Sequence, residues 1–187
     1  MLVGSVIVNK YALIKKDMKK LLLLLPILLS LPLLSQVIIG TGKTVLTNSS
    51  VSLEFGNEPK GLVLPWVSSK EDVVNPEPGT IIFDVKDKKV KVKLLSSWKD
   101  LTVDNSGFVS TVMQDNLLEN KNAKVSIGTP TSVSGILVLE DTDKAMILPT
   151  VNSYKDIMNP APGMMVFDVS HKMLCLFNGS VWSFWNG

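Results

Sequence analysis

The sequence predicts a mainly β fold, made of two tandem small β-meander units that each carry one short helical turn and follow an N-terminal signal segment. Two observations support this prediction. A segment of about forty residues occurs twice, and in both copies short apolar runs alternate with turns rich in Gly, Pro and Asn. In addition, a long apolar run near the N-terminus follows basic residues, which is the layout of a secretory leader.

The duplicated segment has a constant spacing of 84 residues. Residues 60–98 align without a gap with residues 144–182, and 16 of the 39 positions are identical. We predict a structural role for four matched pairs, because Pro, Gly and Asn shape turns and Trp fills cores. These residues are Pro65 and Pro149, Asn75 and Asn159, Gly79 and Gly163, and Trp98 and Trp182.

Both copies predict the same elements in the same order. The expected strands are 62–65, 80–85 and 90–95 in the first copy, and 146–149, 164–169 and 173–177 in the second. Ser68 and Ser153 each stand three residues before an acidic residue and resemble helix N-caps. The turns that they open are expected to reach Val74 and Met158.

The N-terminal region predicts export. Residues 18–20 are Met-Lys-Lys and an almost uninterrupted apolar run fills 21–34, which favours a cleaved signal peptide at 18–35. A retained anchor is the alternative, although a membrane span needs about 20 apolar residues. Residues 1–17 are interpreted as an over-long start. The remainder divides into repeat unit 1 (36–101), a linker (102–123) and repeat unit 2 (124–187), and we expect it to be secreted or on the cell surface.

The two copies differ on one strand face. Cys175 and Phe177 occupy the places of Lys91 and Lys93, so this strand is apolar on both faces in the second copy only. An apolar sheet face left in water would aggregate. We therefore expect the first unit or another chain to cover it, and a homo-oligomer or a complex with another surface protein. The lysines at 86–93 predict a solvated strand face.

Composition argues against several functions. All 19 basic residues are Lys, and without Arg the bidentate contacts typical of nucleic-acid recognition are missing. One Cys and one His are too few for a zinc site built from Cys and His ligands. His171 falls in an expected turn, where solvent exposure is a simpler interpretation than catalysis. We expect no catalytic residues, no metal site and no cofactor, and a membrane contact only through an uncleaved leader.

Aromatic residues are the best candidates for contacts with a partner. Trp98 and Trp182 recur and are expected to close the core of each unit, whereas four other aromatic residues lack a matched partner or lie on the apolar strand face. These candidate ligand or oligomer contacts are Trp66, Trp185, Phe177 and Phe184. An oligomer seam is favoured, and stacking of Trp66 and Trp185 on a polysaccharide is the alternative.

Two further groups of residues have simple structural interpretations. Asp84 and Asp168 are expected to accept hydrogen bonds from backbone N–H groups of turns and caps, rather than to bind a metal or sugar. Cys175 is expected to be inert core.

The order of the motifs resembles a repeat of exported Bacteroidetes surface and fibre-type proteins. The matching segments are Val-x-Ile-Gly-Thr at 125–129, Lys-x-x-x-Leu-Pro at 144–149, Asn-Pro-x-x-Gly at 159–163 and Asn-Gly-x-x-Trp at 178–182. In the first copy Leu94 and Leu95 replace Asn178 and Gly179, so its last turn is expected to differ. The resemblance implies a non-catalytic structural or adhesive surface module.

Overall fold

The computed structural model describes residues 36–112, 114–115, 117–118, 120, 123–129 and 131–186. The chain divides into two compact parts, Met1–Leu34 and Ser35–Gly187, and all described residues belong to the second part, which contains both repeat units. The predicted over-long start and signal peptide, residues 1–35, lie outside the described residues, as do positions 113, 116, 119, 121 and 122 of the predicted linker.

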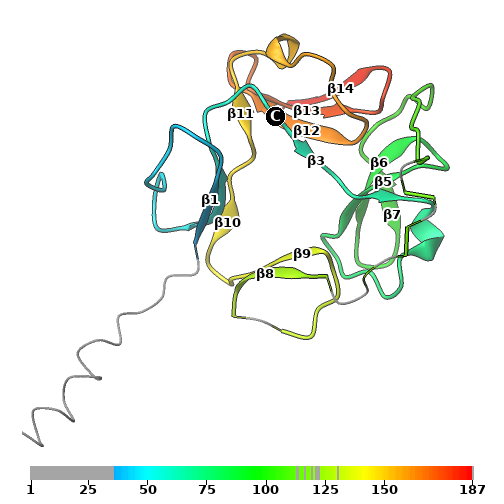
Figure 1. Cartoon of the computed structure of the whole chain (residues 1–187), viewed down its shortest axis with the longest axis horizontal. Helices are drawn as coiled ribbons and strands as arrows, with labels where there is room; N and C mark the ends of the chain where they lie inside the picture. Colours follow the sequence, from blue (N-terminus) through cyan, green and yellow to red (C-terminus); the bar gives the residue numbers. More distant parts are fainter. Residues whose placement is uncertain are drawn as a thin grey trace, which may run out of the picture. The chain divides into compact units, whose positions relative to one another are not determined.

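The mainly β prediction is confirmed, and both repeat units contain the same elements (Figure 1). In the first repeat unit these are β1 (Val37–Ile39), β2 (Val51–Phe55), β3 (Leu62–Val63), β4 (Trp66–Val67), the 3-10 turn η1 (Lys70–Asp72), β5 (Ile81–Asp84), β6 (Lys89–Lys93) and β7 (Trp98–Asp100). In the second they are β8 (Val125–Gly128), β9 (Leu137–Glu140), β10 (Ala145–Met146), β11 (Thr150–Val151), η2 (Tyr154–Asp156), β12 (Met164–Asp168), β13 (Met173–Phe177) and β14 (Trp182–Asn186).

Strand registers and turn geometry show that the two repeat units fold alike. Trp66 pairs with Phe83, and 84 residues later Thr150 pairs with Phe167, both in parallel. Among the described residues, those with a positive φ other than Gly form two matched pairs, Asn75 with Asn159 and Lys88 with Lys172. Gly79 and Gly163 also share a positive φ, of 94° and 76°. The Asn and Gly residues predicted to shape the turns therefore adopt the same backbone conformation in both copies.

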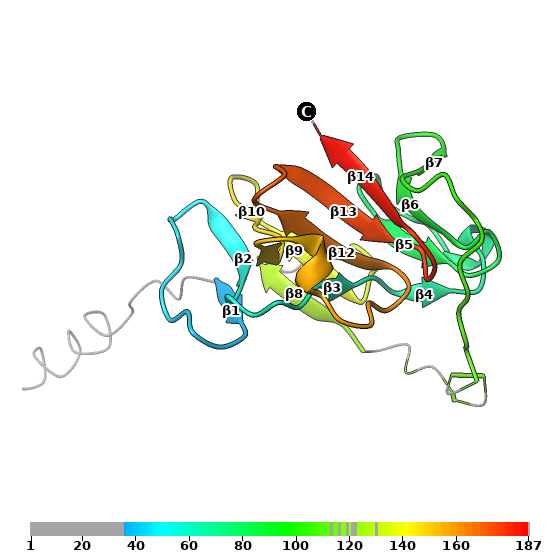
Figure 2. The same cartoon turned by 90° about the horizontal axis from the view of Figure 1, so that it is seen from above.

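Each meander is an antiparallel sheet with one parallel strand at its edge. β5, β6 and β7 pair in order in the first unit, and β12, β13 and β14 in the second, where Figure 2 shows them side by side. Pro65 and Pro149 each separate two very short strands. The Pro65 carbonyl accepts a hydrogen bond from Phe83 N and that of Pro149 from Phe167 N, both at 2.9 Å. A Pro can sit here because only its carbonyl enters the ladder.

The helical turns are shorter than predicted, and one cap is shifted. Ser153 caps η2 in a capping box with Asp156, as predicted. The cap of η1 is Ser69 and not Ser68, in keeping with the repeat, since Ser69 is the residue that matches Ser153. Neither turn reaches Val74 or Met158, because a β-branched residue with extended backbone, at 73 and 157, ends each one.

The two repeat units exchange short strands, which the sequence did not reveal. β3 of the first unit pairs with β12 of the second, in antiparallel register, and lies beside it in Figure 1. β10 of the second unit pairs in parallel with β2 of the first. The parallel pairs β1–β2 and β8–β9 are equivalent, with Val37 opposite Leu53 and Val125 opposite Leu137.

Within the described residues, two clusters of buried side chains lie in the core. The shared core contains residues of both units, namely Leu64, Phe83, Val90, Met165 and Leu176. The second-unit core belongs to the second unit alone and consists of Val151, Ile157, Val166 and Cys175, with Tyr154, Met164, Met173 and Trp182 packed around it.

The prediction that the first unit or another chain covers the Cys175 face is wrong. Cys175 is fully buried within its own unit, under η2 and the side chains of Tyr154 and Trp182. The first unit covers the opposite face of the same strand, where Leu176 enters the shared core. The short turn η2 supplies the missing apolar cover, because in the second unit it carries Tyr154 where η1 carries Lys70.

Candidate functional site

Trp66 lies at the seam between the two repeat units of one chain. Its side chain is half-buried against the shared core, and its Nε1–H donates a 2.7 Å hydrogen bond to the Pro162 carbonyl of the second unit. Trp66 is therefore not an exposed stacking platform. Trp66 thus lies at a seam within one chain, and its predicted contact in an oligomer stays a prediction.

Trp185 makes a similar contact in the opposite direction. Its Nε1–H donates a 2.7 Å hydrogen bond to the Leu101 carbonyl of the first unit, and Lys99 Nζ lies 5.3 Å from its ring centroid. The side chain is still 41% exposed. Stacking of Trp185 on a sugar stays a prediction, whereas the structure does not favour such a role for Trp66.

Phe177 and Phe184 belong to an aromatic cluster on the outer face of the second unit. The Tyr154 ring lies 4.9 Å from that of Phe184 and 5.7 Å from that of Trp182, and Phe177 lies 5.1 Å from Trp182. Phe184 is exposed and the others are half-buried. Trp182 closes the second-unit core as predicted, but Trp98 is half-buried and belongs to neither cluster of described core residues.

Cys175 is the only cysteine, and its environment makes it unreactive. Burial raises the pKa of the thiol to about 11, with the charge of Asp168 acting in the same direction. The reactive thiolate is therefore scarce at neutral pH.

We expect Cys175 to resist a thiol reagent such as dithionitrobenzoate at pH 7–8 in the native protein and to react fully in denaturant. In the native protein, the rate at which Cys175 is labelled should be set by local opening of the second unit. Rapid, stoichiometric labelling without denaturant would show that the Cys175 face is open.

Two buried aspartates hold the helical turns and hairpins together, as predicted. Asp84 accepts backbone hydrogen bonds from Lys70 N (3.0 Å) and Asp87 N (2.9 Å). Asp168 accepts the equivalent bonds from Tyr154 N (3.0 Å) and His171 N (2.8 Å). Each carboxylate therefore ties the turn before its strand to the turn after it.

His171 is a turn residue with one polar partner. Its side chain is 53% exposed, and Nδ1 lies 2.9 Å from Asp168 Oδ2. Burial raises the pKa of Asp168, but hydrogen bonds from the backbone of His171 and Tyr154 and from the His171 side chain outweigh burial and lower it overall. The pair orients the turn between β12 and β13.

The prediction of a solvated lysine face is wrong for Lys91, which is only 2% exposed. Its Nζ lies 2.6 Å from Asp100 and 2.7 Å from Asp87. Burial lowers the pKa of Lys91, but the two carboxylates raise it more. The aliphatic stem fills the place that Cys175 fills in the second unit, and the charge is neutralised at the rim.

Replacing Lys91 with Met should change the free energy of unfolding by less than about 1 kcal/mol, because Met fills the volume of the buried Lys stem and the carboxylates left behind reach solvent. Asp87 and Asp100 are partly exposed and keep Lys70 and Lys89 as partners. Urea denaturation would test this. A loss above about 3 kcal/mol would show that the ion pair itself stabilises the first unit.

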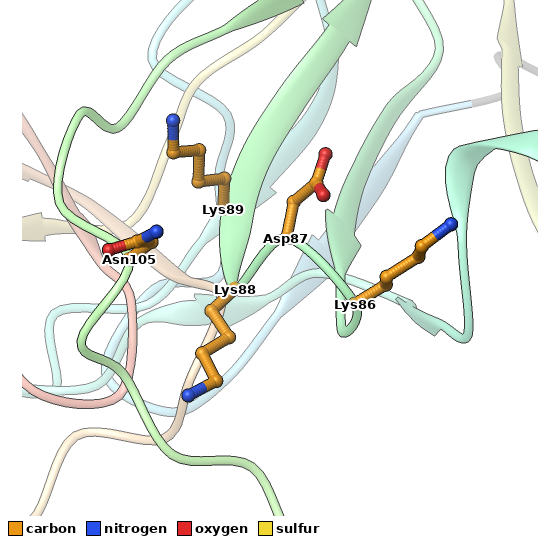
Figure 3. Close-up of a pocket in the computed structure, with 5 residues that line it drawn as sticks. All are labelled: Lys86, Asp87, Lys88, Lys89 and Asn105. Carbon is orange, nitrogen blue, oxygen red and sulfur yellow. The ribbon is translucent and has the colours of Figure 1, made fainter.

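An open hollow of about 330 Å³ lies at the β5–β6 turn and is lined by Lys86, Asp87, Lys88, Lys89 and Asn105 (Figure 3). The three lysine side chains point in different directions in Figure 3, and Lys89 pairs with Asp100. They do not converge on a common ligand position.

Within the described residues, no three His, Cys, Asp or Glu side chains lie close enough together to hold a metal ion. No helix in the described part of the chain has the length and apolarity required to span a membrane.

Comparison with known protein families gives a match in the C-terminal part of the chain. Residues 125–187, which are all but the first residue of the second repeat unit, are similar to the family described as a phage tail like trimerisation region. No curated protein and no solved structure matches the chain. The match supports a structural, fibre-like module that forms homo-oligomers, and it suggests a non-catalytic role.

Proposed function

We propose that the protein is an exported, homotrimeric structural module of a fibre-like assembly at the cell surface. The match of residues 125–187 to a trimerisation region carries this proposal. Two aromatic residues of β14 add support, because Phe184 and Trp185 leave 45% and 41% of their surface exposed. Exposed aromatic residues are enriched at protein interfaces.

Export follows from the predicted signal peptide at 18–35 and from the resemblance to exported Bacteroidetes surface and fibre-type repeats. Within this structural function, the resemblance favours a role in adhesion. The proposal as a whole depends on the trimer, and one preparation of the protein can test both export and the trimer.

The chain should be expressed with its leader in a bacterial host and recovered from the exported fraction. Its N-terminus after processing is expected near Gln36. Size-exclusion chromatography with light scattering should then give the mass of three chains. Retention in the cytoplasm would overturn the export part, and a single-chain mass at micromolar concentration would overturn the trimer.

A further inference from the structure

The first repeat unit has a vacant strand position. The meander of the second unit has a fifth strand, because β3 pairs with the edge of β12 at Met164 and Met165. The equivalent edge of β5, at Thr80 and Ile81, has no strand partner among the described residues, and its sheet has four strands.

Hydrogen-bonding groups are left over at this vacancy. In the filled site, Leu64 N donates to the Gly163 carbonyl at 3.1 Å. The matching groups are the amide of Leu148 and the carbonyl of Gly79, and neither has a hydrogen-bond partner within the described part of the chain.

The packing around the two sites also indicates that the edge of β5 is vacant. A Cβ at Gly163 would lie 2.9 Å from Phe83, whereas one at Gly79 would meet nothing within 4 Å. Leu64 is buried, but Leu148 is only half-buried. The contact at Gly163 and Leu64 is therefore filled within the chain. The equivalent positions, Gly79 and Leu148, are not covered by described residues to the same extent.

The side chains at the two sites are complementary in size. In the filled site, Gly61 lets β3 approach Met164, because a Cβ at Gly61 would lie 2.5 Å from Met164 Cγ. In the vacant site Thr80 replaces Met164, and the strand that would fill it carries Ala145 in place of Gly61. The smaller Thr leaves room for the larger Ala. A Cβ at Gly61 would also lie 2.7 Å from Val166, which Ile82 replaces, so the incoming strand should sit slightly farther out than β3.

A second vacancy faces the other way. β2 has two strand neighbours, β1 and β10, but its equivalent β9 has only β8 among the described strands. Beside β2 this place is filled by β10. The repeat equivalent of β10 is β3, so the strand missing beside β9 is a β3 strand. The second edge of β3, which pairs with no described strand and where Val63 is 42% exposed, is available for it.

We propose that a second copy of the chain adds its β10 segment, residues 144–148, to the vacant edge of β5, so that unit 2 of one chain docks on unit 1 of the next as the units dock within one chain. This inference rests on the proposed homo-oligomer and names its interface. Such a head-to-tail contact joins different surfaces and closes when its rotation completes a ring, here with three chains. By the register of the filled site, Thr80 faces Ile147 and Ile81 faces Met146 of the neighbouring copy.

A size swap tests the contact. Thr80→Met should weaken association about tenfold or more, because the Met side chain meets the Cβ of Ala145. Adding Ala145→Gly recreates the Met164–Gly61 pair of the filled site, and T80M/A145G should recover the trimer. Light scattering over a dilution series gives the masses, and circular dichroism checks that each variant folds. A trimer equally stable in T80M and wild type would overturn the proposal.

A disulfide tests the register without depending on destabilisation. In a Cys175→Ala background, Thr80→Cys with Ile147→Cys should give covalently linked chains on a non-reducing gel. Val63→Cys with Met164→Cys should close within one chain, since these residues face each other in the structure. Thr80→Cys with Lys88→Cys is the unpaired control.

The outcomes separate this inference from the proposed function. A trimer in which T80C/I147C links no better than the control contradicts the strand contact and leaves the trimer intact. A monomeric wild-type protein contradicts both.

Discussion

Phe83→Ala should lower the free energy of unfolding by about 3–5 kcal/mol, the range for a fully buried aromatic residue. Phe83 has no exposed surface and lies in the shared core with Met165 and Leu176 of the second unit. The void would loosen both repeat units, so a single cooperative transition should move to lower denaturant.

The repeat provides the matched control. Phe167 stands at the equivalent position but is half-buried, so Phe167→Ala should cost clearly less. Urea denaturation followed by Trp fluorescence, at a fixed chain concentration, measures both. Equal losses would contradict the placement of the shared core against Phe83.

Asp168→Ala should cost about 2–4 kcal/mol, because it removes a fully buried acceptor and leaves the amides of Tyr154 and His171 without their partner. Asp143→Ala, at an exposed position, is the control and should have little effect. A small effect at Asp168 would show that water replaces the carboxylate.

The contribution of Asp168 should also depend on pH. Its pKa in the folded protein is lowered from 3.8. The stabilisation is therefore complete above the ordinary value and is lost as the pH falls through the lower folded value. Denaturation curves of wild type and D168A should differ at pH 7 and converge at acid pH. A constant difference down to pH 2 would contradict this role.

The sequence was a good guide to elements and turns because the repeat made each one visible twice. Identical Asn, Gly and Asp residues at matched positions predict identical turns, and the φ angles and hydrogen bonds of both copies agree. The position of a cap was harder to predict, since Ser68 and Ser69 are adjacent and both can accept a hydrogen bond.

Contacts over long sequence distances were not visible in the same way. Trp66 contacts Pro162, 96 residues away, and β3 is two residues long, so no local pattern predicts either partner. Lys91 resembles a solvated lysine in an alternating strand. Its burial depends on Asp100 from β7 and Asp87 from the turn, which meet it only in the folded sheet.

The number of chains in the native particle tests the central claim most directly. Isotope-labelled and unlabelled chains should be refolded together and analysed by native mass spectrometry. We expect particles of three chains that contain both kinds in mixed proportions. Single chains, or pairs that never include a third, would contradict a trimeric module.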